Sequence, residues 1–296
     1  MNRTEFLIFL EEEVKKYRGI YMPTRSSFFE RLLTKTCPCK TLHPNPHDEF
    51  CQKGVGPNFE IISQYEEKIR FNREYNRKIF DEALIIEKIR PDGYMLLNGH
   101  HRWGAAILSR VEKVPVKIVN LTHEMDVKQM LWNSKKVKRA ALDLDEVVFA
   151  LDDSTPAEKG LPPLIRKKYP QRLRLGIPAL FRFLTLNGYD IWVYSEKYYS
   201  LDDIKTLFKL YNVQVTGIVT GNDGKQASHG HDGESIEKMI TSHYESTIAI
   251  DNKAVLYVNH KTKAFEEYEL SGSDAEWSAE VMDKIRSFDK NEEQIN

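Results

Sequence analysis

From residue 140 onward, short apolar runs alternate with longer stretches whose apolar residues recur at helical spacing. The runs are typical of strands and the stretches between them of helices. Strands that alternate with helices form parallel sheets, because the chain crosses back over the sheet before it adds the next strand. The alternation therefore predicts an α/β fold. The expected strands are 140–144, 189–194, 213–219, 247–251 and 264–270, and the expected helices are 177–187, 201–211, 234–242 and 275–288.

The length of the chain, 296 residues, is enough for about two domains. Residues 133–139 are polar and basic, which is typical of a joint between domains. We therefore expect a first domain over residues 1–134 and a second over residues 135–296.

Composition and charge argue against several partners. The formal net charge is −1, so no global field attracts nucleic acid or anionic membranes. The basic run at 135–139 is short, and we find no helix-turn-helix pattern. The apolar run at 6–10 meets three glutamates and is too brief for a membrane span or a signal peptide. Three cysteines without a secretory signal indicate a reducing compartment. We expect a cytoplasmic protein with no membrane and no nucleic-acid partner.

One short motif in the first half indicates anion binding. An apolar run ends at Asn98-Gly99, a pair that breaks strands, and His100, His101 and Arg102 follow before a run of small residues. This is the pattern of a strand, a glycine turn and a helix N-terminus, where backbone N–H groups attract phosphate. The guanidinium can clamp two phosphate oxygens, and the imidazoles can donate to phosphate or exchange a proton. The alternative is an exposed Asn-Gly hairpin turn.

On this motif, and on strands expected at 84–88 and 114–119, the chain resembles the ParB/sulfiredoxin superfamily. It looks most like the free serine kinase branch, whose motif reads Asp-Gly-His-His-Arg. The resemblance covers about residues 80–121 and implies an α+β domain that binds ATP or another nucleotide. Asn98 replaces the acid that opens the kinase motif, so a charge that helps to hold Mg²⁺ is missing. The resemblance also suggests Glu49 as a catalytic base, with a solvated loop acid as the alternative.

A loop rich in cysteine and histidine precedes this motif. Cys37, Cys39, His43, His47 and Cys51 place five potential metal ligands within 15 residues. Their spacing matches no zinc motif, and three prolines among them indicate an irregular loop. Metal binding by this loop stays open, with an ordinary structural loop as the favoured interpretation.

Two carboxylates mark a second candidate site. Asp143 and Asp145 end the buried-strand pattern that begins at Ala140. Residues two apart on a strand point to the same side, so both can face one site at the carboxyl edge of the sheet, where open α/β folds bind ligands. One carboxylate can attack phosphorus while the other transfers a proton. Such a pair needs a cation such as Mg²⁺, because two carboxylates repel each other and the phosphate.

Together with three later motifs, this pair resembles the haloacid dehalogenase superfamily of aspartyl phosphotransferases. The later motifs are a strand that ends at Ser195, a lysine for which Lys225 is the best candidate, and a strand that ends at Asp251. The resemblance implies that Asp143 is the nucleophile and Asp145 the general acid and base. It implies that Ser195 bonds the phosphoryl group and that Lys225 offsets its charge. The Mg²⁺ ligands would be Asp143, Asp145 and Asp251.

Alternatives and departures remain for this second site. Ser195 can instead cap a helix or a turn, and Lys225 can be an ordinary solvated lysine. Asn252 stands where many members carry a second acid. Residues 151–174 leave room for only a modest cap, so the resemblance implies a Rossmann-like parallel-sheet domain with a minimal cap.

We therefore expect a Mg²⁺-dependent phosphatase or phosphotransferase that acts on a small phosphorylated molecule and carries an N-terminal nucleotide-binding module. One alternative is a bifunctional enzyme whose first domain is an ATP- or ADP-dependent kinase of a small molecule such as serine. The other is a non-enzymatic ParB-like nucleotide switch or DNA-associated protein.

Overall fold

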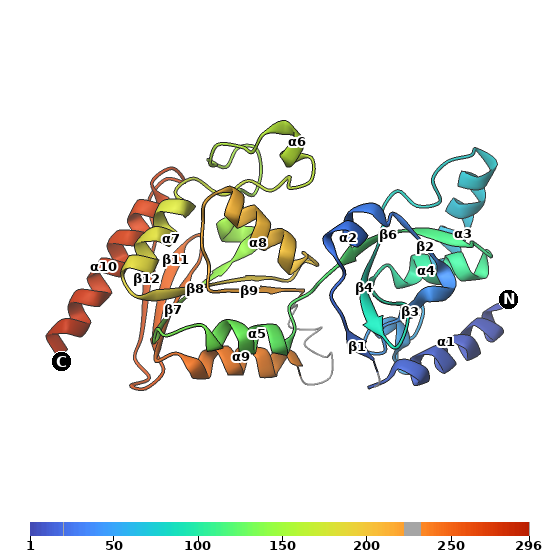
Figure 1. Cartoon of the computed structure of the whole chain (residues 1–296), viewed down its shortest axis with the longest axis horizontal. Helices are drawn as coiled ribbons and strands as arrows, with labels where there is room; N and C mark the ends of the chain where they lie inside the picture. Colours follow the sequence, from blue (N-terminus) through green and yellow to red (C-terminus); the bar gives the residue numbers. More distant parts are fainter. Residues whose placement is uncertain (20, 222–231, 296) are drawn as a thin grey trace. The chain divides into compact units, whose positions relative to one another are not determined.

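The computed structural model describes residues 1–19, 21–221 and 232–295, and the chain forms two compact units (Figure 1). The first unit spans Met1–Leu121 and the second begins at Thr122. This division precedes the boundary that we predicted after residue 134. The reason is that the helix before the basic joint packs into the second unit through Val127 and Leu131.

The first unit is an α+β fold on a six-stranded sheet. Its elements are α1 (Arg3–Tyr17), β1 (Met22–Pro23), α2 (Phe28–Leu33), β2 (Thr36–Pro38), η1 (Cys39–Thr41), β3 (Leu42–Pro44), η2 (Glu49–Cys51), α3 (Phe59–Glu74), β4 (Leu84–Arg90), β5 (Tyr94–Asn98), α4 (His100–Leu108) and β6 (Lys113–Val119). The strand order is β2-β6-β4-β5-β3, and β1 pairs with β4. The sheet is mixed, since β4 runs antiparallel to β5 but parallel to β6.

The helices of the first unit enclose an aromatic core. Phe6 of α1, Ile62 of α3 and Trp103 of α4 have no exposed surface. Gly104 allows the close approach of α4, because an added Cβ would lie 3.2 Å from the rings of Phe6 and Phe50. The strand, glycine turn and helix predicted around Asn98 are confirmed by β5 and α4.

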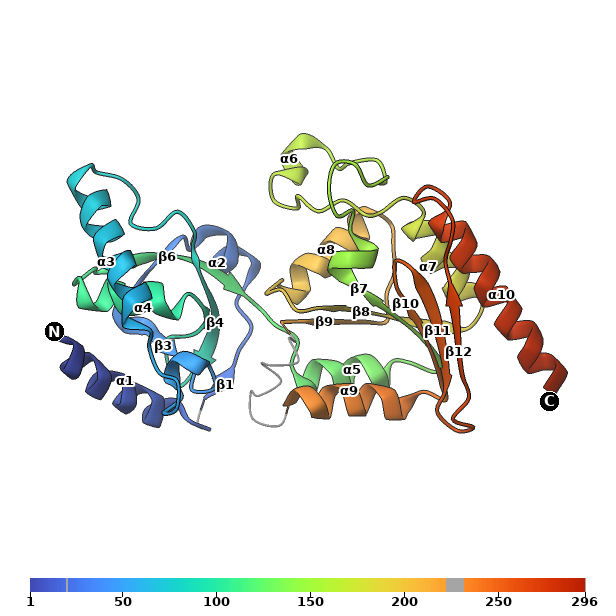
Figure 2. The same cartoon turned by 180° about the vertical axis from the view of Figure 1, so that it is seen from behind.

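The second unit is a sheet with helices on both faces (Figures 1 and 2). Its elements are α5 (Glu124–Trp132), β7 (Lys138–Asp143), the π-helical turn η3 (Leu144–Val148), α6 (Pro163–Arg166), α7 (Ile177–Leu186), β8 (Tyr189–Ser195), α8 (Leu201–Leu210), β9 (Gly217–Thr220), α9 (Asp232–His243), β10 (Ser246–Ile250), β11 (Ala254–Asn259), β12 (Phe265–Glu269) and α10 (Trp277–Ile295).

The second sheet has the order β12-β11-β10-β7-β8-β9. Its strands β10, β7, β8 and β9 are parallel, as the alternation of strands and helices predicted. The prediction of a wholly parallel sheet is wrong, because β11 and β12 are antiparallel additions. We did not predict β11, which follows β10 after a turn too short for a parallel crossover.

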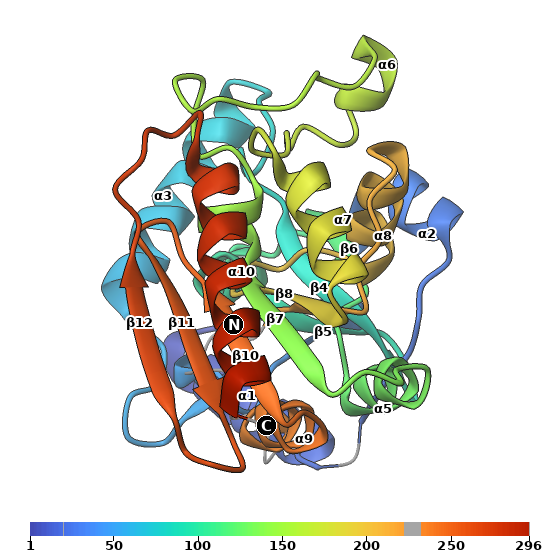
Figure 3. The ribbon, with the colours of Figure 1, turned by 90° about the vertical axis from the view of Figure 1, so that its left-hand side faces the viewer.

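Alternation along β8 divides the core of the second unit between the two faces. Ile191 and Val193 pack with α7, α8 and α10, whereas Trp192 packs with α5 and α9. Figure 3 shows α10 lying against one face of this sheet. Residues 151–174 form an irregular excursion that contains only the short α6 (Figure 1). Among the described residues, no helix has the length and apolar character needed to cross a membrane.

The contact between β8 and β9 gives a test of this packing. Gly217 is paired with Trp192, and an added Cβ would lie 2.2 Å from the buried indole ring. We expect Gly217→Ala to lower the free energy of unfolding by about 1–3 kcal/mol, measured by urea denaturation, because overpacking forces the ring to move. The matched control is Gly160→Ala, where the nearest atom is 3.9 Å away. Equal stabilities of the two variants would contradict the packing described.

Candidate functional site

The second unit brings the predicted acids to one edge of its sheet. β7 ends at Asp143, β8 ends at Ser195, and β10 ends one residue before Asp251. Because β7 lies between β8 and β10 and is parallel to both, these three carboxyl ends meet at the same edge. Neighbouring strands are about 4.8 Å apart, so residues far apart in the sequence become neighbours here.

Asp143 is partly buried and caps the turn that follows it. Its Oδ1 accepts the backbone N–H groups of Asp145 and Glu146, both at 2.7 Å. These bonds hold one carboxylate oxygen against the start of η3, so the two oxygens of Asp143 have different surroundings. Single π-helical turns are frequent at functional sites.

Asp145 accepts bonds from three side chains. The hydroxyl of Ser195 donates at 2.6 Å, the hydroxyl of Tyr199 at 2.7 Å, and the ammonium of Lys197 lies at 2.9 Å. The structure thus brings Asp145 and Ser195 together. Sequence reasoning missed Lys197 and Tyr199, although the spacing Ser-x-Lys-x-Tyr directly after a predicted strand was a signal that could have found them.

The Tyr199 hydroxyl is a donor in this cluster. Burial raises its pKa, and the hydrogen bond to the Asp145 carboxylate raises it further. The ring packs edge-on against Phe149 at a centroid distance of 6.1 Å. Tyr199 is therefore fixed at both ends, by an aromatic neighbour and by a carboxylate.

The acid after β10 sits in an anchored loop. Asp251 is exposed, and its carboxylate accepts the backbone N–H of Lys253 at 3.2 Å. The side chain of Asn252 accepts from buried Arg174 at 2.6 Å. The Arg174 guanidinium also lies over the Trp277 ring, 4.2 Å from its centroid. Arg174 therefore connects the end of the irregular excursion to the loop that presents Asp251.

The structure does not test the predicted role of Lys225, and it does not by itself complete the predicted Mg²⁺ site. Lys225 lies outside the described residues. Within the described ranges, no three side chains of His, Cys, Asp or Glu gather closely enough to hold a metal ion. A cation at this edge would therefore be completed by water or by oxygens of the substrate as well as by carboxylates.

In the first unit, Gly99 sets the geometry of the predicted phosphate loop. Its φ is +100°, and an added Cβ would lie 3.1 Å from both Arg102 Nη2 and Leu84 Cγ. Only glycine fits this conformation and this space. The turn at Gly99 directs the chain from β5 into α4.

Arg102 is held inside the first unit. Its Nη1 donates to the backbone carbonyl of Glu82 at 2.9 Å, and its Nη2 donates to Asn98 Oδ1 at 3.1 Å. The guanidinium therefore links the segment before β4 to the end of β5. The phosphate-clamping role of Arg102 stays a prediction, and a stabilising role stands beside it.

His100 is buried under the loop that precedes α3. Its Nε2 accepts the backbone N–H of Asn45 at 3.2 Å, and its Nδ1 lies 3.3 Å from Asp48 Oδ2. Burial lowers the pKa of His100 to about 4, against the opposing effect of Asp48. His100 is therefore neutral at physiological pH.

His101 is more accessible than its neighbour. Its Nε2 accepts the backbone N–H of Asn58 at 3.3 Å, which leaves Nδ1 to carry the proton of the neutral ring. Burial lowers its pKa as well. Phe50 packs against both imidazoles, at centroid distances of 5.6 Å for His100 and 5.0 Å for His101.

The acid beside this motif is Asp48 and not its neighbour Glu49. Glu49 is exposed in η2, whereas Asp48 contacts His100 and caps η2 through Phe50 N. Nothing in the sequence distinguishes two adjacent acids in an irregular loop. The catalytic-base role of Glu49 stays a prediction.

The cysteine- and histidine-rich loop does not gather its ligands. Both ring nitrogens of His43 have partners, Glu13 at 2.8 Å and the Tyr17 hydroxyl at 3.0 Å. Burial raises the pKa of the Cys39 thiol to about 11. An ordinary structural loop stays the favoured interpretation.

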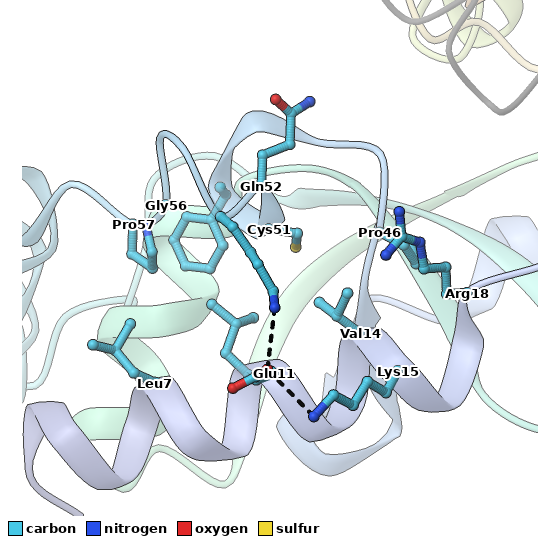
Figure 4. Close-up of a pocket in the computed structure, with 13 residues that line it drawn as sticks. Leu7, Glu11, Val14, Lys15, Arg18, Pro46, Cys51, Gln52, Gly56 and Pro57 are labelled. Carbon is cyan, nitrogen blue, oxygen red and sulfur yellow. Dashed lines mark ion pairs between the residues drawn. The ribbon is translucent and has the colours of Figure 1, made fainter.

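A cavity of about 760 Å³ lies between α1 and the loop after β3 (Figure 4). Leu10, Val14 and Phe50 give it an apolar surface. Glu11 forms ion pairs with Lys15 at 3.3 Å and Lys53 at 3.8 Å, drawn as dashed lines in Figure 4. The cavity is thus apolar inside with paired charges at its mouth, and Phe50 separates it from the histidines of α4.

Comparison with protein families gives one match for this region. Residues 78–135 match the model of the ParB N-terminal domain, which includes the β4–β5 hairpin, α4 and β6. The N-terminal part of this chain is ParB-like. The ParB part of the predicted resemblance is therefore confirmed. The finer likeness to free serine kinases and the likeness of the second unit to haloacid dehalogenases stay predictions.

Solved structures of ParB are also among the matches. Two are of the C-terminally truncated chromosome-partitioning protein ParB from Caulobacter crescentus, one in complex with the centromeric parS site and one with CTP-γ-S. Both are 19% identical to this chain, with TM-scores of 0.23 and 0.24. They cover 34% and 35% of this chain and 47% and 55% of their own, so the chain spans about half of each. No curated protein matches the sequence.

These comparisons give no support to the expectation that nucleic acid is not a partner. That expectation stays a prediction from the net charge, the short basic run and the lack of a helix-turn-helix pattern in the sequence.

The burial of His100 predicts how stability changes with pH. Its pKa is about 4 in the fold and about 6.5 in the unfolded chain, so the unfolded chain binds more protons between these values. Stability is therefore greatest above pH 6.5 and falls as the pH drops toward 4, by on the order of 3 kcal/mol from this group. We expect His100→Gln to flatten this dependence, measured by urea unfolding at a series of pH values.

The control for this measurement is His243→Gln, since His243 is exposed. It should retain the pH dependence of the unmodified protein. A dependence in His100→Gln as steep as that of the control would contradict the buried, neutral state of His100.

Proposed function

We propose that the second unit is a Mg²⁺-dependent phosphatase or phosphotransferase that works through an aspartyl-phosphate on Asp143. One observation carries the proposal: Asp143, Asp145, Ser195 and Asp251 lie at the carboxyl edge of adjacent parallel strands, and Asp145 is bonded to Ser195 at 2.6 Å. Open α/β folds bind ligands at this edge. Carboxylates and a hydroxyl there are the groups that phosphoryl transfer through an acyl-phosphate requires.

The chemistry of these side chains suits Mg²⁺. Carboxylate oxygens are its preferred protein ligands, and it commonly takes one or two of them together with water and substrate phosphate. Asp143 and Asp251 follow paired strands and would hold it, with Asp145 close by. When bound, the cation neutralises charge on the phosphoryl group.

The residues of the chain then divide the reaction into two steps. A carboxylate oxygen of Asp143 forms a bond to phosphorus and the bond from phosphorus to the leaving oxygen breaks. Asp145, which must carry a proton when the substrate is bound, gives that proton to the leaving oxygen. Asp145 next takes a proton from water, which attacks phosphorus and releases phosphate and the Asp143 carboxylate. In a phosphotransferase, an acceptor hydroxyl replaces the water. Ser195, which is buried, holds Asp145 in position through its single O–H. The bond from Ser195 to the phosphoryl group that the resemblance implies would compete with this contact.

The nucleophile assignment has a direct test. We expect Asp143→Asn to abolish Mg²⁺-dependent release of phosphate from aryl and sugar phosphates, because an amide does not attack phosphorus. The loss should be at least about a thousandfold, with the melting temperature little changed. The matched control is Asp153→Asn, at an exposed acid of the irregular excursion. Turnover by Asp143→Asn equal to that of the control would refute the nucleophile.

For the first unit we propose nucleotide binding without phosphate transfer. The N-terminus of α4 follows a left-handed glycine, and the match to the ParB N-terminal domain covers this turn. Helix N-termini of this kind bind phosphate. Transfer is the less favoured alternative because Glu49 is exposed and Asn98 replaces the acid of the kinase motif. A non-enzymatic nucleotide switch or DNA-associated role remains the third alternative.

Titration calorimetry with ATP, ADP and CTP tests this binding. We expect His101→Ala to weaken binding about tenfold, because the imidazole lies in the first turn of α4 and can donate to phosphate. His101 is a better probe than Arg102, whose bonds to Glu82 and Asn98 make its removal destabilising.

Lys53→Ala at the cavity mouth is the comparison variant, and its affinity should not change. A loss confined to Lys53→Ala would move the ligand to the cavity, and no binding by the unmodified protein would refute the proposal. Phosphorylation of free serine would establish the kinase alternative, and binding of duplex DNA the third alternative.

A further inference from the structure

We propose that Lys197 is the cation that receives the substrate phosphate at the edge of the second sheet, by moving its ammonium from Asp145 to the phosphoryl oxygens. This inference rests on the proposed function of the second unit and names a residue and a ligand class for it: the dianion of a phosphate monoester. Lys197 lies in the loop after β8, which brings it near the site. The inference assigns to it a role that the sequence suggested for Lys225.

The backbone of Lys197 is fixed at the site. Its N–H donates to Ser195 Oγ at 3.0 Å, and its carbonyl accepts the N–H of Gly221, which follows β9, at 3.1 Å. The residue therefore connects the ends of two adjacent strands. Ser195 also donates to Asp145. The backbone of Lys197 therefore cannot move away from the strand ends without breaking these hydrogen bonds.

The other end of Lys197 is free to move. Its ammonium lies 2.9 Å from Asp145 Oδ1, but the side chain is 65% exposed. An ion pair with this exposure contributes little, so the ammonium can exchange partners at small cost. A lysine is a flexible point charge with three donors, which suits a phosphoryl group that changes shape during transfer.

Charge at this edge requires such a cation. Asp143, Asp145, Glu146 and Asp251 bring negative charge to the strand ends, and a phosphate dianion adds two more charges. A Mg²⁺ ion would offset only part of that sum. Lys197 is a described cation that already contacts one of these carboxylates.

Asp145 keeps its position when the ammonium leaves. The hydroxyls of Ser195 and Tyr199 still donate to it, at 2.6 and 2.7 Å, and they bind opposite oxygens of the carboxylate. Burial keeps the Tyr199 hydroxyl protonated by raising its pKa. The cluster is therefore built so that one charged donor can exchange while two neutral donors hold the carboxylate.

Direct binding of inorganic phosphate tests the inference without relying on turnover. Calorimetric titration of the intact chain in the presence of Mg²⁺ should show phosphate affinity about tenfold weaker in Lys197→Met than in the unmodified protein. Lys197→Arg should retain most of the affinity, because it keeps the charge. Lys209→Met, at an exposed lysine of α8, is the matched control and should bind like the unmodified protein.

Affinity in Lys197→Met equal to that in Lys209→Met would overturn the role of Lys197, and so would an unmodified protein that binds no phosphate. Circular dichroism confirms that each variant is folded, which the exposure of Lys197 leads us to expect. The proposed phosphatase activity is refuted by a different result, namely unchanged turnover in Asp143→Asn. Weakened phosphate binding in Lys197→Met supports the inference in either case.

Discussion

Parallel pairing of β7 with β8 on one side and β10 on the other is the interaction on which the second unit depends. It places three carboxyl ends at one edge and gives the sheet two faces, each of which buries helices. Ser195 and Asp251 thereby become neighbours of Asp143 although dozens of residues separate them in the chain. The described residues of the first unit, 1–19 and 21–121, form no such edge. The candidate site of this unit is built at one helix N-terminus after a glycine turn.

The strands and helices around both sites could be predicted from apolar periodicity, but the antiparallel part of the second sheet could not. The strand composition of β11 does not reveal its direction. Direction follows from the connection: the turn after Asp251 is only a few residues long, and a parallel return needs a crossover of about a dozen. Loop length, taken together with strand composition, would have predicted the hairpin of β10 and β11.

For the candidate sites, the sequence predicted residues at strand ends and missed residues whose contacts depend on the path of a loop. Asp143 and Ser195 close their strands, so periodicity marks them. Asp145 lies beyond β7 in η3, and not on the strand where we expected it. Lys197 and Tyr199 reach Asp145 only because the chain turns after β8. The role of Arg102 was harder for a different reason: one of its partners is a backbone carbonyl, and such acceptors leave no trace in residue identity.

Because Arg174 is bonded to Asn252, the two ends of the irregular excursion at 151–174 differ in how firmly they are held. Its C-terminal end is held by buried Arg174, whose backbone N–H also bonds to Val148 at 2.9 Å, whereas residues near 152 are exposed. Insertions or deletions near the first end should be tolerated in evolution, because they displace solvent-facing chain. Insertions or deletions near Arg174 would shift the loop that carries Asp251, because Arg174 is bonded to Asn252. Variation in length among descendants of this sequence should therefore accumulate on one side of α6.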